Sequence, residues 1–258
     1  MFRALLILIC CTASTAAQAD SCPARPNALG TERVLAIDTA ISLRIGRKQF
    51  PDTLPLAPKE VVLTFDDGPW PTTTRAVLDA LKDECVQATF FLLGRHAIAN
   101  SELARCEHDE GHTTAYHTFD HALLDRMPLS AAEAEIDRGI IAVNSVVYGR
   151  ADASPAAPFF RLPGFASAPL LLDQLNSRGI VVFGTDLWAS DWNPMTPEQE
   201  LQLVMTWLRA VGGGIVLFHD TRSETAAMLS AFLKELKDQG YRVVHVVPAG
   251  PRPAPHRS

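Results

Sequence analysis

The chain has 258 residues, of which 47% are apolar and 20% are charged, and its mass is 28.1 kDa. This composition predicts a globular chain with a sizeable core and excludes a chain that is disordered throughout. The formal net charge is −6 with no basic tract, which argues against a nucleic-acid partner. The length allows one large domain as readily as two small ones.

The N-terminus has the features of a secretory signal. Arg3 precedes the apolar run Ala4–Cys11, and residues 17–19 (Ala-Gln-Ala) match an A-x-A cleavage site. The apolar run is too short to span a bilayer, although an anchor that is never cleaved is the alternative. We therefore expect residues 1–19 to be removed and the protein to be exported, periplasmic or secreted, with no stable membrane span.

Three cysteines follow the expected cleavage site, namely Cys22, Cys85 and Cys106. Export places them in an oxidising compartment. A disulfide between Cys85 and Cys106 and two buried thiols are both compatible with the sequence. No C-x-x-C motif occurs, so the sequence does not support a cysteine–zinc site.

Two flanking segments differ in composition from the rest of the chain. Residues 20–58 are rich in alanine, proline and polar residues without clear periodicity, and we expect a leader that wraps the domain or stays mobile. Residues 248–258 form a Pro-rich tail. The main domain is therefore expected over residues 59–247.

Short apolar runs and amphipathic stretches alternate within this domain. Buried parallel strands are predicted over residues 61–65, 88–93, 113–117, 159–161, 180–184, 214–218 and 242–247. Helices are predicted over residues 73–84, about 101–109, 168–178 and 223–239, with two more beginning near Ser130 and Thr196. Glu133 and Gln199 stand in capping-box spacing to these two residues. Seven β–α steps favour an α/β barrel or a doubly wound open sheet, and periodicity does not separate the two.

Polar side chains follow most of the predicted strands. Asp66 and Asp67 follow the first, His117 and His121 the third, Arg161 ends the fourth, Asp186 follows the fifth, and His219 and Asp220 follow the sixth. In parallel α/β folds the C-terminal ends of the strands converge on one face, where active sites lie. We therefore expect these side chains to be neighbours in space.

The spacing of His117 and His121 suggests a metal site. On a helical turn, residues four apart point the same way, which suits two ligands of one metal. Asp66 or Asp67 would complete the set and leave a position open for water, as in hydrolytic zinc sites. The other carboxylate can accept a proton, and His219 can act as the acid. A solvated histidine pair and a plain Asp-Gly-Pro turn are the alternatives.

Trp188 and Trp192 flank Asp191. Aromatic rings near a cleft can stack on sugar faces, but buried core tryptophans are as common. A carboxylate such as Asp191 behind a histidine can orient its ring and hold its proton.

Together these residues resemble the polysaccharide deacetylases with a NodB-homology domain, carbohydrate esterase family 4, over about residues 59–247. Five motifs of that family occur in order: T-F-D-D-G-P at 64–69, H-[ST]-x-x-H at 117–121, an arginine–proline motif at 161–164, an aspartate–tryptophan motif at 191–192, and L-x-H at 217–219. The resemblance implies a deformed (β/α)7 barrel in a single domain. It also implies hydrolysis of N-acetyl, and possibly O-acetyl, groups on an acetylated glycan.

The resemblance also implies roles for individual residues. Asp67, His117 and His121 would bind one divalent metal, usually Zn²⁺, with Co²⁺, Ni²⁺ or Mn²⁺ as alternatives. Asp66 would be the base, held ionised by Arg161, and His219 the acid, supported by Asp191. A backbone N–H near Gly164 would stabilise the oxyanion, and Trp192 would line the substrate cleft.

Two departures from the family pattern matter. Gly164 stands where the family often has an aromatic residue, so a side-chain wall of the cleft is expected to be lost. The segment from Asp186 to Trp192 is longer than usual, which leaves Asp186 as an alternative to Asp191, although Trp192 directly follows Asp191. A catalytically silent carbohydrate-binding barrel and a metallohydrolase of a small non-glycan amide are the competing functions. Chitin oligomers, peptidoglycan, xylan and exopolysaccharide all remain open as the glycan.

Overall fold

The computed structural model describes residues 25–41 and 43–250. The predicted signal peptide and residues 251–258 of the Pro-rich tail lie outside this part of the chain.

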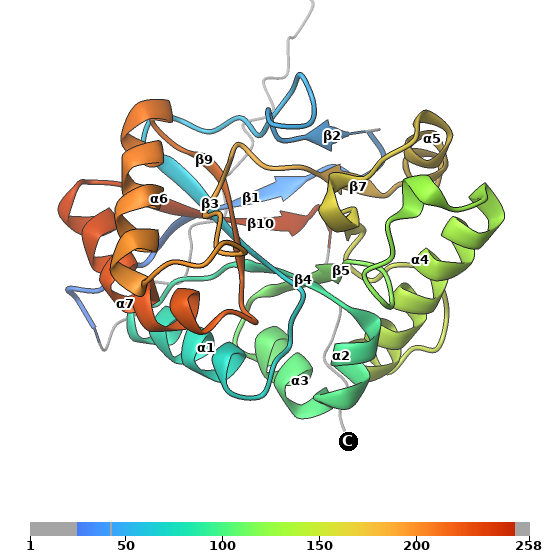
Figure 1. Cartoon of the computed structure of the whole chain (residues 1–258), viewed down its shortest axis with the longest axis horizontal. Helices are drawn as coiled ribbons and strands as arrows, with labels where there is room; N and C mark the ends of the chain where they lie inside the picture. The colour runs from blue at the N-terminus through green and yellow to red at the C-terminus, as the bar shows by residue number, and fades with distance from the viewer. Residues whose placement is uncertain (1–24, 42, 251–258) are drawn as a thin grey trace, which may run out of the picture.

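Within the described ranges, ten parallel strands form the centre of the molecule (Figure 1). They are β1 (Thr31–Ile37), β2 (Arg44–Ile45), β3 (Glu60–Asp66), β4 (Thr89–Leu92), β5 (Thr113–Tyr116), β6 (Phe159–Phe160), β7 (Val181–Phe183), β8 (Leu187–Trp188), β9 (Gly214–His219) and β10 (Arg242–Pro248). The strand order is β1-β10-β3-β4-β5-β6-β7-β2, while β9 pairs with β3 and β8 with β9. All seven predicted strands are present.

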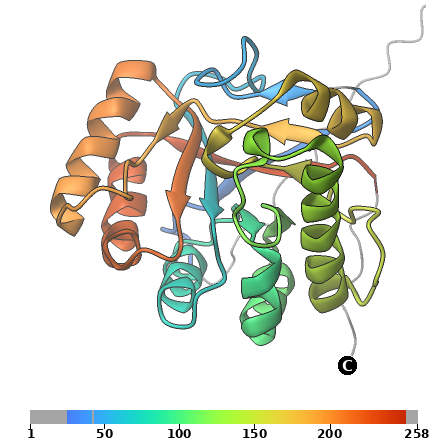
Figure 2. The same cartoon turned by 45° about the vertical axis from the view of Figure 1, so that its right-hand side comes forward.

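The described part of the chain has seven α-helices, which lie beside and below these strands in Figures 1 and 2. They are α1 (Thr73–Asp83), α2 (Gly94–Ala99), α3 (Ser101–Asp109), α4 (Leu129–Val143), α5 (Pro169–Ser177), α6 (Pro197–Val211) and α7 (Ser223–Asp238). The short helix α2 was not predicted. None of the helices in the described ranges has the length and apolarity that a bilayer crossing requires.

Two separate apolar cores show that the sheet is curled. The outer core lies between strands and helices, and includes Leu63 and Phe65 of β3. The inner core takes the alternate residues of the strands, such as Val62, Phe91 and Ile215. Because successive residues of a strand face opposite sides, an inner core of this kind requires a curled sheet. The predicted fold, a deformed (β/α)7 barrel in one domain, is confirmed.

The segment expected as a leader is part of this sheet. β1 pairs with β10 and β2 pairs with β7, both in parallel. The expectation that residues 20–58 merely wrap the domain or stay mobile is therefore wrong for these strands. β1 lies at the edge of the sheet and most of its residues are only half-buried, so its sequence lacks the continuous apolar run of the central strands.

Capping boxes were predicted at the starts of two helices, and one of them is present. The capping box of α6 is confirmed, because Gln199 N–H donates to Thr196 Oγ1 and Thr196 N–H to Gln199 Oε1. The box proposed for Ser130 and Glu133 is wrong. Helix α4 begins one residue earlier, at Leu129, so Pro128 takes the N-cap position and no side chain caps the helix.

The two cysteines of the main domain do not bond to each other. Cys85 is in a disulfide, and Cys106 is a half-buried free thiol. The disulfide between Cys85 and Cys106 that the sequence left open is therefore excluded.

Candidate metal and active site

His117 and His121 meet on one side of the barrel, although they do not lie on a helix. Both follow β5, and Thr118 and His121 adopt left-handed backbone conformations, with φ of 69° and 63°. These residues fold the loop back on itself, so that the two rings lie 5.1 Å apart between centroids. The expectation of a helical turn is wrong, but the two histidine side chains do lie next to each other as predicted.

A glycine allows helix α4 to pack against this loop. A Cβ atom on Gly139 would lie 2.4 Å from the carbonyl carbon of Thr118, so any side chain here would displace the loop. Glu135 of the same helix accepts hydrogen bonds from the main-chain N–H groups of Phe119 and Asp120. Helix α4 therefore holds the loop that carries His117 and His121 in place.

Asp67 completes a three-residue cluster. It follows β3 with a left-handed backbone (φ 75°), and its Oδ1 lies 3.5 Å from Nε2 of both His117 and His121. One donor atom from each residue falls within 4.8 Å of the others. Asp67 Oδ1 is buried, yet it has no hydrogen-bond partner among the described residues. An unpaired carboxylate oxygen facing two imidazole nitrogens fits a divalent metal, because the metal would replace the missing partner.

His117 is held in the form that a metal requires. Its Nδ1 lies 2.7 Å from the carbonyl oxygen of Arg161, which requires an N–H at Nδ1 and leaves the Nε2 lone pair facing Asp67. Burial lowers the pKa of His117 to about 3, so the ring is neutral at physiological pH. The chemistry of this donor set fits Zn²⁺, which is bound by neutral imidazoles and carboxylates.

Asp66 points into the barrel beside this cluster. It is 2% exposed, and Arg161 Nη1 donates to its Oδ1 at 2.7 Å. Burial raises the pKa of Asp66, and the charge and hydrogen bond of Arg161 oppose this rise. Arg161 is fully buried and also donates to Thr64 Oγ1 and the Gly184 carbonyl, so its guanidinium is fixed in place.

His219 lies at the end of β9 and is held by Asp191. Asp191 Oδ1 accepts from His219 Nδ1 at 2.7 Å, and its Oδ2 accepts from the main-chain N–H of His219 at 2.6 Å. Burial lowers the pKa of His219, but the hydrogen bond and charge of Asp191 outweigh this effect and raise it to about 9.

Asp186, the alternative partner of His219, forms its hydrogen bonds with other residues. Its carboxylate accepts from the main-chain N–H groups of Arg47 and Ile215 and from the Thr53 hydroxyl. It thereby ties the segment after β2 to the barrel. Of the two aspartates, Asp191 contacts His219.

One cavity of about 410 Å³, here called the central pocket, joins these groups. Its lining residues are Asp66, Asp67, His117, His121, Leu162, Gly164, Phe165, Trp188, Trp192, Leu217, His219 and Arg222. Trp192 stands edge-on to His219, with ring centroids 6.0 Å apart. The cleft wall expected to be lost at Gly164 is supplied by the next residue, since Phe165 lines the pocket and its ring lies 6.2 Å from that of Trp188.

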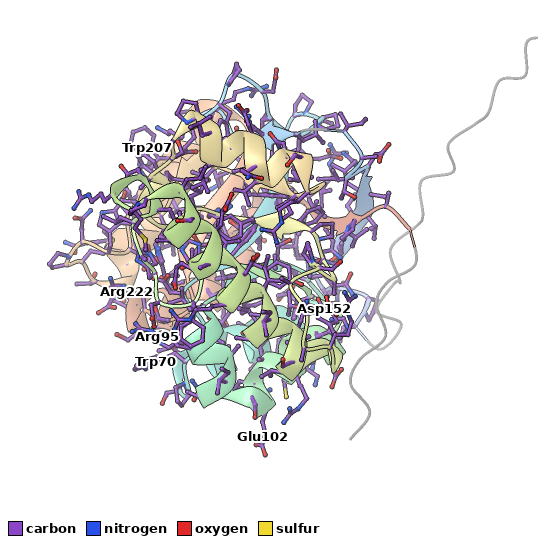
Figure 3. All side chains as sticks on the ribbon, turned by 90° about the vertical axis from the view of Figure 1, so that its right-hand side faces the viewer. Trp70, Arg95, Glu102, Asp152, Trp207 and Arg222 are labelled. Carbon is purple, nitrogen blue, oxygen red and sulfur yellow. The ribbon has the colours of Figure 1, made fainter. Side chains whose placement is uncertain are left out.

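A second cavity of about 530 Å³, here called the side pocket, adjoins the central one. Its lining residues are Asp67, Trp70, Leu93, Arg95, His96, Asp120, His121 and Thr221, so the two pockets share Asp67 and His121. Figure 3 shows Trp70, Arg95 and Arg222 along the same side of the molecule. These three residues belong to no chemical pattern in the sequence and were not predicted, because only the fold brings them to the site.

Comparison with known proteins agrees with this geometry. Residues 54–182 match the family model described as polysaccharide deacetylase. The chain is 32% identical over 188 residues to the peptidoglycan-N-acetylglucosamine deacetylase PgdA of Listeria monocytogenes, covering 73% of this chain and 38% of that protein. It is 30% identical over 198 residues to a chitooligosaccharide deacetylase of Rhizobium leguminosarum, covering 71% of this chain and 88% of that protein.

Among solved structures, a peptidoglycan deacetylase of Bdellovibrio bacteriovorus has the same fold. The TM-score is 0.77 at 31% identity, covering 88% of this chain and 62% of that one. This chain thus spans less than two thirds of the Listeria and Bdellovibrio proteins. The family model nevertheless covers β3 and β5, the strands that Asp67, His117 and His121 follow. On these grounds the chain belongs to the polysaccharide deacetylase family, carbohydrate esterase family 4.

Proposed function

We propose that this protein is a metal-dependent deacetylase that removes acetyl groups from an extracytoplasmic glycan. The observation that carries the proposal is the unpaired Asp67 Oδ1, which faces two imidazoles in a pocket that also holds a buried carboxylate and a histidine–aspartate pair. A divalent metal held by Asp67, His117 and His121 would polarise the acetyl carbonyl and make water a better nucleophile. Zn²⁺ suits this donor set.

Asp66 is the base in this proposal. It borders the central pocket, and its Oδ2 lies 3.8 Å from Nε2 of the metal-site residue His117, so it adjoins the place where water would attack. Arg161 favours its ionised form, while burial keeps it basic enough to take a proton from the attacking water. A main-chain N–H near Gly164, which lines the same pocket, would stabilise the oxyanion that develops.

His219 is the acid. Because its pKa is raised to about 9, it carries a proton at neutral pH and can give it from Nε2 to the leaving nitrogen. Asp191 fixes the tautomer and the ring orientation through Nδ1. Trp192, Leu217 and Phe165 supply apolar surface beside these groups, which suits the methyl group of an acetyl and a sugar face.

The competing functions fit these observations less well. A silent carbohydrate-binding barrel would not need a metal-site cluster, a buried base and a paired histidine in one pocket. A small amide would fill only the central pocket, whereas two adjoining cavities lined by tryptophans suit a longer chain of sugars.

The side pocket suggests a preference among glycans. Trp70 is 46% exposed and stands edge-on to His96, whose Nδ1 hydrogen-bonds to the Asp67 carbonyl oxygen. No hydrogen bond or ion pair of the Arg95 side chain is found within residues 25–41 and 43–250, and Asp120 in the same pocket is paired with Arg138. We propose that this pocket takes the neighbouring sugar, with Trp70 as the stacking surface and Arg95 attracting a carboxylate. Peptidoglycan, which carries carboxylates on its stem peptides and on muramic acid residues that lack a stem, is then favoured over chitin, which has none.

Acetate release tests the proposal. The purified protein is incubated with N-acetylglucosamine oligomers, peptidoglycan and acetylated xylan, with and without a chelator, and Zn²⁺ is then added back. We expect release from at least one of these glycans, its loss with chelator and its recovery with metal. Absence of release from all three, with metal bound, would contradict the proposed activity. The predicted signal at residues 1–19 agrees with such a substrate, because these glycans lie outside the cytoplasm.

A further inference from the structure

Behind His219 and Asp191 the structure contains two more buried polar residues, Thr225 and Glu200. Thr225 on α7 and Glu200 on α6 are both fully buried. Thr225 Oγ1 lies 2.9 Å from Asp191 Oδ2 and 2.8 Å from Glu200 Oε1. A continuous line of hydrogen-bonding distances therefore runs from His219 through Asp191 and Thr225 to Glu200.

The two contacts of Thr225 determine how many of the carboxyl groups of Asp191 and Glu200 are ionised. The Thr225 hydroxyl carries one hydrogen but faces two carboxyl groups. If both carboxyls were ionised, one of the two contacts would bring acceptor against acceptor. One of the two carboxyl groups must therefore carry a proton for both contacts to be hydrogen bonds.

The proton belongs to Glu200. Asp191 accepts two N–H bonds from His219, and bonds of this kind favour the ionised form. Among the described residues Glu200 has no N–H donor, and its buried Oε2 has no hydrogen-bond partner. Burial, together with the charges of Asp191 and Glu224, raises the pKa of Glu200 to about 7, although the hydrogen bond of Thr225 and the charge of His219 oppose this rise.

We propose that Glu200 is a positioning residue for the acid His219, acting by directing the Thr225 hydroxyl. When protonated, Glu200 donates to Thr225 Oγ1, and Thr225 donates to Asp191, which then has three donors. When Glu200 loses its proton, Thr225 turns to it, Asp191 loses the third donor, and a second negative charge appears nearby. Asp191 then attracts the proton of His219 more strongly, which raises the pKa of that histidine and makes it a poorer acid.

The inference rests on the proposed function only for its consequence in catalysis, so its test does not require turnover. The ring nitrogens of ¹⁵N-labelled His219 are followed by NMR in the zinc-loaded enzyme across the pH range. We expect a first inflection near pH 7, where Glu200 ionises, and a later one where His219 itself titrates. In Glu200→Gln the first inflection disappears and the pKa of His219 falls, because the amide N–H₂ keeps donating to Thr225.

Two further variants separate this role from a packing effect. Glu198→Gln removes the same charge from an exposed site in the first turn of α6 and should leave both inflections in place. Thr225→Val should weaken the first inflection, because only the through-space effect of Glu200 remains, and Thr225→Ser should restore it. The proposal is overturned if the wild-type titration has no step near pH 7. It is also overturned if that step persists unchanged in Glu200→Gln. Loss of acetate release with these titrations intact would instead count against the proposed function.

Discussion

His219 and Asp191 are joined by two hydrogen bonds, one from the imidazole Nδ1 at 2.7 Å and one from the main-chain N–H at 2.6 Å. Because the two donors are the ring and the main chain of the same residue, the Asp191 carboxylate fixes the imidazole ring relative to the His219 backbone. His219 lines the central pocket together with Asp67, His117 and His121. The pairing with Asp191 therefore sets both the orientation and the protonation of His219 in this pocket.

The metal-site residues are tested by metal content. His117→Ala and Asp67→Asn should each abolish acetate release and most of the bound metal. The first leaves only two donors, and the second replaces an anionic carboxylate with a neutral amide oxygen, a poor zinc ligand. Metal is measured by atomic emission after gel filtration. His219→Ala, which alters the same pocket without removing a proposed ligand, should retain its metal. Stoichiometric metal in His117→Ala would contradict the assignment.

Asp66 should behave differently from its neighbour. Asp66→Asn should keep the metal and lose turnover by about 10²–10⁴-fold, the usual contribution of a general base. The measurement is kcat with an N-acetyl glycan alongside metal content. If this variant lost its metal while Asp67→Asn kept it, the roles of the two aspartates would have to be exchanged.

His219 should matter most where the leaving group is poor. An amide nitrogen leaves only after it gains a proton, whereas an activated aryl acetate ester has a good leaving group of its own. His219→Ala should therefore reduce deacetylation of an N-acetyl glycan far more than hydrolysis of the aryl ester. Equal losses on both substrates would argue against an acid role.

The pH dependence follows from the raised pKa of His219. A histidine with a folded-state pKa of about 9 is protonated at neutral pH, so kcat on an amide should fall as the pH rises through about 9. The stabilisation from its pair with Asp191 is fully present below the unfolded value of about 6.5 and is lost over the same alkaline range. In Asp191→Asn the carboxylate charge is gone, so the alkaline limb of the kcat profile should move to lower pH. An unchanged limb would show that another group controls it.

Arg95 should influence which glycan is preferred. Arg95→Gln should lower kcat/KM about three- to fivefold on glycan strands that carry muramic acid, as expected for an exposed ion pair, and leave neutral N-acetylglucosamine oligomers almost unaffected. The same strands with amidated carboxyls should not respond to the substitution. Arg209→Gln, an exposed change on α6 outside both pockets, is the control. If Arg222→Gln alone removed the preference, the carboxylate would lie at the central pocket instead.

Much of the fold was readable from the sequence because the central strands are buried on both faces. Continuous apolar runs such as Val61–Phe65 therefore marked β3 and its neighbours, and turn residues marked their ends. The edge strand β1 escaped detection because most of its residues are half-buried. β2 and β8, of two residues each, were not predicted either, although the equally short β6 was.

The sequence by itself determined which residue types stand at the carboxyl ends of the strands, and hence that Asp66, Asp67, His117, His121 and His219 would share one face. Chain connectivity and strand polarity suffice for that. Only the tertiary structure decided that a left-handed loop rather than a helix brings the histidines together, and that Asp191 rather than Asp186 holds His219. It alone revealed Glu200 behind Thr225. Those outcomes depend on side-chain directions and on contacts between residues far apart in the chain, which local sequence pattern does not encode.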